Sequence, residues 1–200
     1  MSERGGDRRE VGRVEAFSDG VVAIIITIMV LELKAPVAEG LDHIWALWPT
    51  FVAYLLSYAY VGVYWVNHHR LMVHATRVTD GLVWSNLALL FALSLVPFAT
   101  AYLGDHRFSR PATLLWLGTM LAPAVIWPWL QAVIRRTGDH SPEAAAYHQR
   151  TGRKGLAATA LYLLGLPLTF VAPWLGVLCA ALVAFFWMTP ESRIDRWFAR

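Results

Sequence analysis

The chain has 200 residues, of which 57% are hydrophobic and only 16% are charged. Soluble domains carry about 25% charged residues, so this composition excludes an ordinary soluble domain and indicates an integral membrane protein. Ten tryptophans fit side chains that favour the interface between water and lipid. The single cysteine, Cys179, excludes an intrachain disulfide and any metal site built from several cysteines.

Charged residues divide the chain into uncharged blocks that mark the expected membrane helices. A spanning helix needs about 20 residues, and three blocks are long enough for one helix each. A further block, between Lys154 and Glu191, is long enough for two short helices with a turn at Pro173. With the first apolar stretch, the sequence predicts six transmembrane helices, over 14–33, 44–70, 80–103, 111–136, 154–172 and 174–190.

The longest loop contains a signal for a further helix. In residues 137–153, Ser141 is followed by a proline, the pattern of a helix N-cap and first helical position, which predicts a short surface helix. No loop can hold a separate domain. Residues 1–200 are therefore expected to form one six-helix transmembrane domain, with a short N-terminal segment (1–13) and a C-terminal tail (191–200).

The basic residues determine the expected orientation. Six helices place both termini on the same side of the membrane. All but three of the 17 Lys and Arg residues fall on that side, and the exceptions are Lys34, Arg107 and Arg110. Because cytoplasmic loops carry the excess of basic residues, both termini are expected in the cytoplasm and the protein in the cell inner (plasma) membrane. This distribution also explains the isoelectric point of about 9.2 without a nucleic-acid partner.

Signatures of catalysis, cofactor binding and metal binding are missing from the sequence. It contains no GxxxxGKS/T, GxGxxG, HExxH or GxSxG pattern, so we expect no enzyme and no cofactor. His69 and His74 lie five positions apart, a poor spacing for two ligands of one metal on a helix, so we expect no metal site. The TVGYG filter of potassium channels and the arginine ladder of voltage sensors are also missing.

The first apolar helix carries acidic residues close to its middle. In RVEAFSDGVVAIIITIMVLEL, residues 13–33, only twelve uncharged residues separate Asp19 from Glu32. They reach about 18 Å, whereas the hydrocarbon core is roughly 30 Å thick. Because ionisable residues at membrane depth face protein or water, we expect other helices to enclose this one and to supply a partner for Asp19, unless Arg13 is that partner. Candidates at the end of the second expected helix are Trp65, Asn67, His68 and His69.

One face of the same helix is a row of small and apolar side chains. Gly20, Ile24, Thr27, Ile28 and Leu31 follow the spacing of a single helical stripe. From the spacing alone, packing against neighbouring helices is the favoured interpretation, and lining of a pore is the alternative.

Two motifs resemble those of a known family. Arg13, Phe17, Ser18 and Asp19 match the R-x-x-x-F-S-D signature of the transmembrane protein 175 family, the endosomal and lysosomal potassium channels and their prokaryotic relatives. The segment YWVNHHRLM is similar to that family's motif between its second and third helices. The six expected helices match one repeat of the family. One repeat per chain implies a homotetramer, as in the prokaryotic members.

The resemblance implies a cation channel lined by the first helix of each subunit, with potassium as the permeant ion. Ile24 falls on the apolar constriction, Thr27 on a threonine linked to potassium preference, and Ile28 and Leu31 on further apolar rings. The four signature residues would tie this helix to its neighbours without touching the ion. An apolar ring does not replace the hydration shell, so we expect weak selectivity for potassium over sodium. Without an arginine ladder, we expect little voltage dependence.

Two other classes of protein stay open. A transporter coupled to protons or another ion could use Asp19 or His68 as a relay, although the paired repeats and broken helices of transporters are not evident. The motif could also hold together a structural membrane protein that conducts no ions.

Overall fold

The computed structural model describes residues 3–188, and the regular secondary structure in this part of the chain is entirely α-helix. The expected C-terminal tail, 191–200, lies outside the described residues. The helices are α1 (Glu3–Leu31), α2 (Leu41–Trp45), α3 (Trp48–Met72), α4 (Asp80–Ser94), α5 (Val96–Asp105), α6 (Arg110–Thr137), α7 (Pro142–Val171) and α8 (Pro173–Met188).

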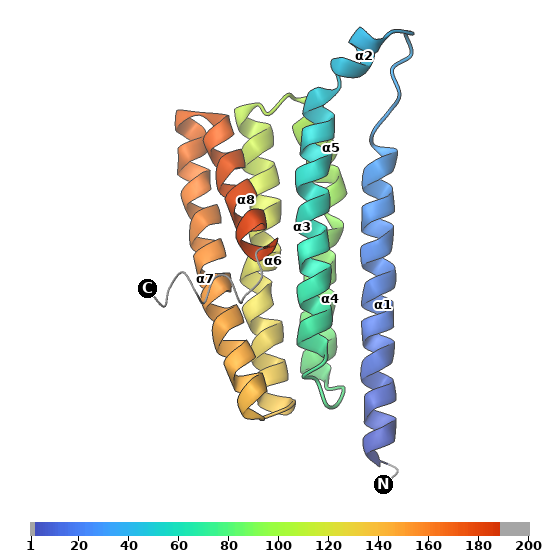
Figure 1. Ribbon diagram of the computed structural model, residues 1–200, viewed down its shortest axis with the longest axis vertical. Helices are drawn as coiled ribbons and strands as arrows, with labels where there is room; N and C mark the ends of the chain where they lie inside the picture. The colour runs from blue at the N-terminus through green and yellow to red at the C-terminus, as the bar shows by residue number, and fades with distance from the viewer. Residues whose placement is uncertain (1–2, 189–200) are drawn as a thin grey trace.

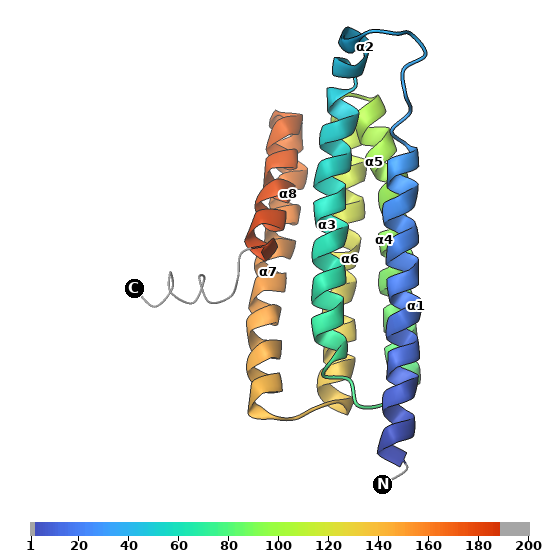
Figure 2. The same cartoon turned by 45° about the vertical axis from the view of Figure 1, so that its right-hand side comes forward.

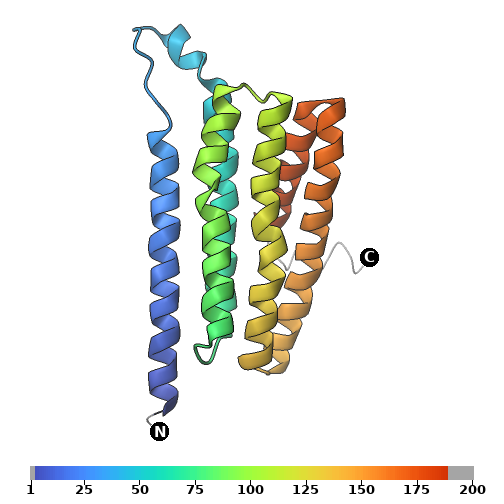
Figure 3. The same ribbon diagram turned by 180° about the vertical axis from the view of Figure 1, so that it is seen from behind.

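The long helices run side by side in one bundle (Figure 1). Helix α1 forms one edge, α3 and the α4–α5 pair lie next to it, and α6, α7 and α8 form the other edge, as the view from behind also shows (Figure 3). The short helix α2 lies beyond the ends of α1 and α3 (Figure 2). Helix α1 packs mainly on α3, α4 and α5.

Local sequence explains where the helices begin. The hydroxyl oxygen of Thr79 accepts a hydrogen bond from the Leu82 amide at 3.2 Å and so caps α4. Ser141 caps α7 in the same way, by accepting from the Ala144 amide at 3.2 Å. A proline stands in the first turn of α3, α5, α6 and α7, where its missing amide hydrogen has no helical partner to lose.

The prediction of a short surface helix in residues 137–153 is wrong in its extent. Ser141 does precede a helix, but α7 continues without a break to Val171. After Pro142 come Glu143 and three alanines, and no proline precedes the apolar part, so nothing in this segment ends the helix. The 30 residues of α7 reach about 45 Å, more than the hydrocarbon core requires.

The expected helix over 80–103 is present but interrupted. It is divided into α4 and α5 at Leu95, two residues before Pro97. Proline has no amide hydrogen, so the regular bond from position 97 to the carbonyl of Leu93 is not made. The backbone at Leu95 keeps a helical conformation, and the two helices follow one another as a single apolar stretch, Asp80–Asp105.

Several helices have the length and composition of membrane spans. Within residues 3–188, four helical stretches are long and apolar enough to cross a membrane: Gly6–Leu31, Asp80–Asp105, Arg110–Thr137 and Pro142–Val171. Helix α8 is apolar but has only 16 residues, and α3, with 25 residues, is not among the four.

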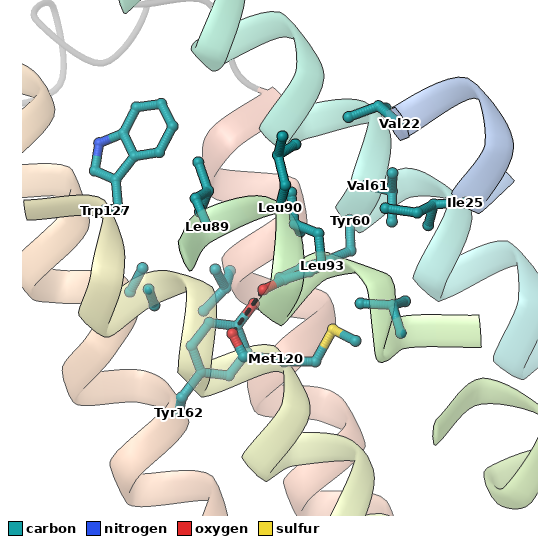
Figure 4. Packing of buried hydrophobic residues seen from close by; sticks show 14 of the residues in the cluster. Val22, Ile25, Tyr60, Val61, Leu89, Leu90, Leu93, Met120, Trp127 and Tyr162 are labelled. Carbon is teal, nitrogen blue, oxygen red and sulfur yellow. Dashed lines mark hydrogen bonds between the residues drawn. The ribbon is translucent and has the colours of Figure 1, made fainter. Parts of the chain in front are cut away.

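The core lies between α3, α4, α6 and α7. Trp116, Met120 and Tyr162 are among the largest side chains that are fully buried there. The Tyr60 hydroxyl reaches across the core and donates to the Met120 carbonyl at 2.6 Å (Figure 4). Helix α1 joins this core from the side through Val22 and Ile25, so the rest of the bundle forms a frame against which α1 is held.

Candidate functional site

The two faces of α1 have different surroundings. Val22, Ile25 and Met29 are buried against the bundle at helical spacing, and Val11 and Ser18 extend this stripe toward the N-terminus. The opposite face is open: the exposed fractions are 55% for Phe17, 58% for Ile24, 41% for Ile28 and 73% for Leu31. Other helices of the same chain therefore cover only one side of α1. We call the side that carries Ile24, Thr27, Ile28 and Leu31 the open face.

Polar groups border the open face. The Thr27 hydroxyl donates to the Ile24 carbonyl at 2.9 Å, so its hydrogen is engaged by the backbone. The Thr27 oxygen keeps acceptor capacity toward the surroundings of the helix. At the end of α1, Glu32 lines a groove together with Ile24 and Ile28, against α5. The open face is thus an apolar row with a carboxylate at one end.

A chain of hydrogen bonds joins α3, α4 and α1 inside the bundle. Nε2 of His68 lies 2.7 Å from Oδ1 of Asn86, and Nδ2 of Asn86 donates to the Ser18 hydroxyl at 2.9 Å. Ser18 donates in turn to the Val14 carbonyl at 2.8 Å. His68, Asn86 and Ser18 are all buried. Because an amide oxygen can only accept, this network assigns the proton of His68 to Nε2.

Two further contacts join α3 to α1. Trp65 donates through Nε1 to Oδ1 of Asp19 at 2.9 Å. Nδ1 of His69 lies 2.6 Å from a carboxylate oxygen of Glu15. Asn67 does not reach α1; its side chain donates to the Val63 carbonyl of its own helix at 2.8 Å. Three of the four candidate side chains at the end of α3 therefore help to hold α1.

Of the expected partners of Asp19, the structure shows Trp65 and not Arg13. Among the described residues, neither Arg13 nor a histidine pairs with Asp19, and the partner of its carboxylate is the indole of Trp65. Arg13 is exposed, and within the described part of the chain it belongs to neither of the two close contacts between a carboxylate and a histidine, which join Asp42 to His43 and Glu15 to His69. Asp19 itself is only half-buried in the single chain.

Two residues of this site were not predicted from the sequence. Asn86 joins His68 to Ser18, and Glu15 accepts from His69. Asn86 had a signal, because it is the only amide side chain in the apolar stretch Asp80–Asp105. Glu15 had none, since its place on the helix does not distinguish it from a solvated acid.

The three histidines singled out in the sequence have separate partners. In residues 3–188, no group of three His, Cys, Asp or Glu side chains is arranged to hold a metal ion. His74 instead lies against the rings of Tyr147 and His148, at 4.8 and 5.6 Å between centroids. His68 and His69 point to different partners on α4 and α1.

Apolar helices of membrane length, joined by buried polar side chains, define a multi-pass integral membrane protein. A family model described as endosomal/lysosomal potassium channel TMEM175 matches residues 13–97, which include every residue of the network. The chain is 39% identical over 186 residues to a potassium channel of Chryseobacterium sp. (strain P1-3), covering 92% of this chain and 96% of that one. The chain belongs to the TMEM175 family, a family of ion channels and not of enzymes.

The similarity extends to a solved structure. A crystal structure of a lysosomal potassium-selective channel TMEM175 homolog from Chamaesiphon minutus superposes with a TM-score of 0.76 at 32% identity, covering 90% of this chain and 96% of that one. The endosomal/lysosomal proton channel TMEM175 of Rattus norvegicus is 33% identical over 110 residues, which are 49% of this chain and 22% of the rat protein. This is a channel family without a cofactor, and potassium is a permeant ion.

Proposed function

We propose that this protein is a potassium-permeable cation channel, a homotetramer in which α1 of each subunit lines a central pore. The observation that carries the proposal is the open face of α1, where Ile24, Ile28 and Leu31 are uncovered by their own chain. Lipid can also cover an apolar face, but the apolar part of α1 between Asp19 and Glu32 is too short to face lipid across the bilayer, which favours protein neighbours on this side. Relatives that match nearly the whole chain are named potassium channels, and this supports a pore as the result of subunit association.

The proposed topology has six spans in one domain over residues 1–200: α1, α3, α4 with α5, α6, α7 and α8. It places both termini in the cytoplasm and the chain in the inner (plasma) membrane, since nearly all basic residues then lie on the cytoplasmic side. Helix α8 is the shortest span at about 24 Å, a mismatch that local thinning of the bilayer can absorb.

The proposed constriction is a ring of four Ile24 side chains, with Thr27, Ile28 and Leu31 on the extracytoplasmic side of it. A narrow apolar ring gates by dewetting, because water and hydrated ions leave a passage that offers them no hydrogen bonds. When open, it favours the more easily dehydrated potassium ion over sodium, but only weakly. No described helix carries an arginine ladder within its apolar span, so little voltage dependence follows.

The proposed role of the signature residues is to hold α1 in place. Ser18 and Asp19 do so within the subunit, through the contacts with Asn86 and Trp65. Arg13 and Phe17 are exposed in the single chain, and we assign them to contacts with a neighbouring subunit. His68, His69 and Asn67 belong to the same scaffold at the end of α3.

A second candidate function is proton movement, either as a channel or as a coupled transporter with Asp19 or His68 as relay. The observation in its favour is that the rat relative is named a proton channel. The two candidates differ in their driving force. A potassium channel reverses at the potassium equilibrium potential and needs no coupled ion, whereas a coupled transporter needs a second gradient. A structural membrane protein would conduct nothing.

The test is flux through purified protein in liposomes, with potassium, sodium and proton movement measured side by side. We expect potassium flux that exceeds sodium flux severalfold and is independent of a pH gradient. Cross-linking in the same liposomes should end at tetramers. Flux that requires a pH gradient, or cross-linking that stops at dimers, would replace the proposed channel with one of its alternatives.

A further inference from the structure

The α6–α7 hairpin is basic on the side where its two helices join. Between Arg110 and Val171 the only acidic residues are Asp139 and Glu143, both near the turn. Past Arg110, the same segment carries four arginines with exposed side chains and one buried lysine: Arg135, Arg136, Arg150, Arg153 and Lys154. This end of the hairpin therefore presents an excess of positive charge.

The length of α7 places part of this charge at the membrane surface. The helix reaches about 45 Å, whereas the hydrocarbon core is roughly 30 Å thick, so about ten residues project from it. With Ala172 at the outer boundary, the inner boundary falls near Gly152. Arg150 and Arg153 stand on either side of this position, at the depth of the lipid headgroups.

Helix α8 marks the same level independently. Nζ of Lys154 lies 5.6 Å from the ring centroids of both Phe186 and Trp187, in the last turn of α8. Helix α7 continues well past this point, toward the end of the bundle where the N-terminus lies (Figure 1). Below Lys154, α8 therefore no longer covers α7, and the boundary drawn from helix length coincides with the end of the last apolar helix.

The side chains at this level match a phospholipid. Arg150 and Arg153 are three positions apart, on one face of α7, and both are exposed. Leu156 follows one turn deeper on that face and is 72% exposed. Guanidinium groups bind phosphate by paired charge-assisted hydrogen bonds, and basic residues at the cytoplasmic surface attract anionic lipids.

We propose that Arg150 and Arg153 bind the headgroup phosphate of an anionic phospholipid of the cytoplasmic leaflet, with Leu156 against its acyl chain. The inference rests on the orientation given under the proposed function, and it does not depend on ion conduction. A zwitterionic lipid fits less well, because its ammonium group brings positive charge to a basic surface.

The test uses the full-length protein in nanodiscs of phosphatidylcholine with a small fraction of phosphatidylglycerol. Native mass spectrometry measures the apparent affinity for phosphatidylglycerol. We expect Arg150→Gln and Arg153→Gln each to lower it about fivefold, and the double variant about 25-fold. The matched control is Arg135→Gln with Arg136→Gln, which removes the same charge from the last turn of α6. This control should change the affinity less than about threefold.

Two outcomes overturn the proposal. Equal losses in both double variants would mean that net charge attracts the lipid without a site, and no loss in either would mean that this surface binds none. Potassium flux is measured on the same protein in liposomes. Retention of phosphatidylglycerol that depends on Arg150 and Arg153, in protein without flux, would support the lipid site and contradict the channel.

Discussion

At the scale of single residues, Asn86 carries an unusual share of the contacts between α1 and the frame. One amide bonds two other buried side chains, on two other helices, through its oxygen and its nitrogen. A charged residue in this place would need full compensation at membrane depth, whereas an amide is neutral and satisfies a donor and an acceptor together. The hydrogen bonds of Asn86 therefore join α1 to α3 and α4 without a buried charge.

Replacement of Asn86 by alanine should destabilise the fold. His68 would keep a buried donor and Ser18 would lose a partner, and each unsatisfied group costs about 1–3 kcal/mol. The free energy of unfolding, from denaturant titration of the protein in detergent, should fall by at least about 1 kcal/mol. Asn67→Ala is the matched control, because that amide bonds only the Val63 carbonyl of its own helix and is half-buried. Equal losses of unfolding free energy in the two variants would contradict a special contribution of Asn86 to holding α1.

At the scale of helices, charged borders located most elements because an unpaired charge is costly within the bilayer. Expected and observed limits agree within a few residues for α3, α6 and α8. The borders failed where a charged stretch is itself helical. Helix α1 begins at Glu3 and α7 at Pro142, in segments that were expected to lie outside the membrane helices.

The faces of α1 were harder to predict than its existence. Val22, Ile25 and Met29 are as apolar as Ile24, Ile28 and Leu31, so composition does not tell the buried stripe from the open one. Which stripe is buried depends on the helices that pack against α1, and these are α3, α4 and α5, far along the chain. The Ser18–Asn86 bond spans 68 positions and lay beyond any local pattern.

The packing of α5 on α3 depends on a glycine. A Cβ added to Gly104 would lie 2.7 Å from the Cα of Thr50, which is backbone and has no room to move. Gly104→Ala should therefore push the helices apart and lower the free energy of unfolding by about 1–3 kcal/mol. Gly118→Ala, on exposed α6 surface with nothing within 4 Å, should raise it by up to about 1 kcal/mol through helix propensity. Thermal unfolding of both variants checks the opposite signs; a stabilised Gly104→Ala would contradict the close packing.

At the scale of the proposed assembly, the electrostatics of the proposed pore mouth can be tested through Glu32. It stands one turn past Ile28 and shares a groove with Ile24 and Ile28, so four copies would place four carboxylates near the extracytoplasmic mouth. Glu32→Gln should lower single-channel conductance severalfold in about 0.01 M salt, where the Debye length is about 30 Å. The effect should vanish near 1 M, where it is about 3 Å.

Glu39→Gln is the control for that measurement, because Glu39 is an exposed loop residue outside the groove. It removes the same charge from the same side of the membrane. If both substitutions lower the conductance equally at low salt, surface charge in general concentrates the cation, and Glu32 has no special position at the mouth.

The proposed constriction at Ile24 gives the last prediction. If the Ile24 ring sets the barrier by excluding water, polarity there matters more than size. Ile24→Asn should admit water and hydrated ions, raise total flux and bring sodium permeation close to that of potassium, while Ile24→Leu should stay selective. Ile26→Asn is the control on the other face, where Ile26 is half-buried against the bundle; it should keep selectivity at some loss of stability. The measurement is potassium and sodium flux for all three variants in the same liposomes. Selectivity lost in Ile26→Asn but kept in Ile24→Asn would mean that the pore lies on the other face of α1.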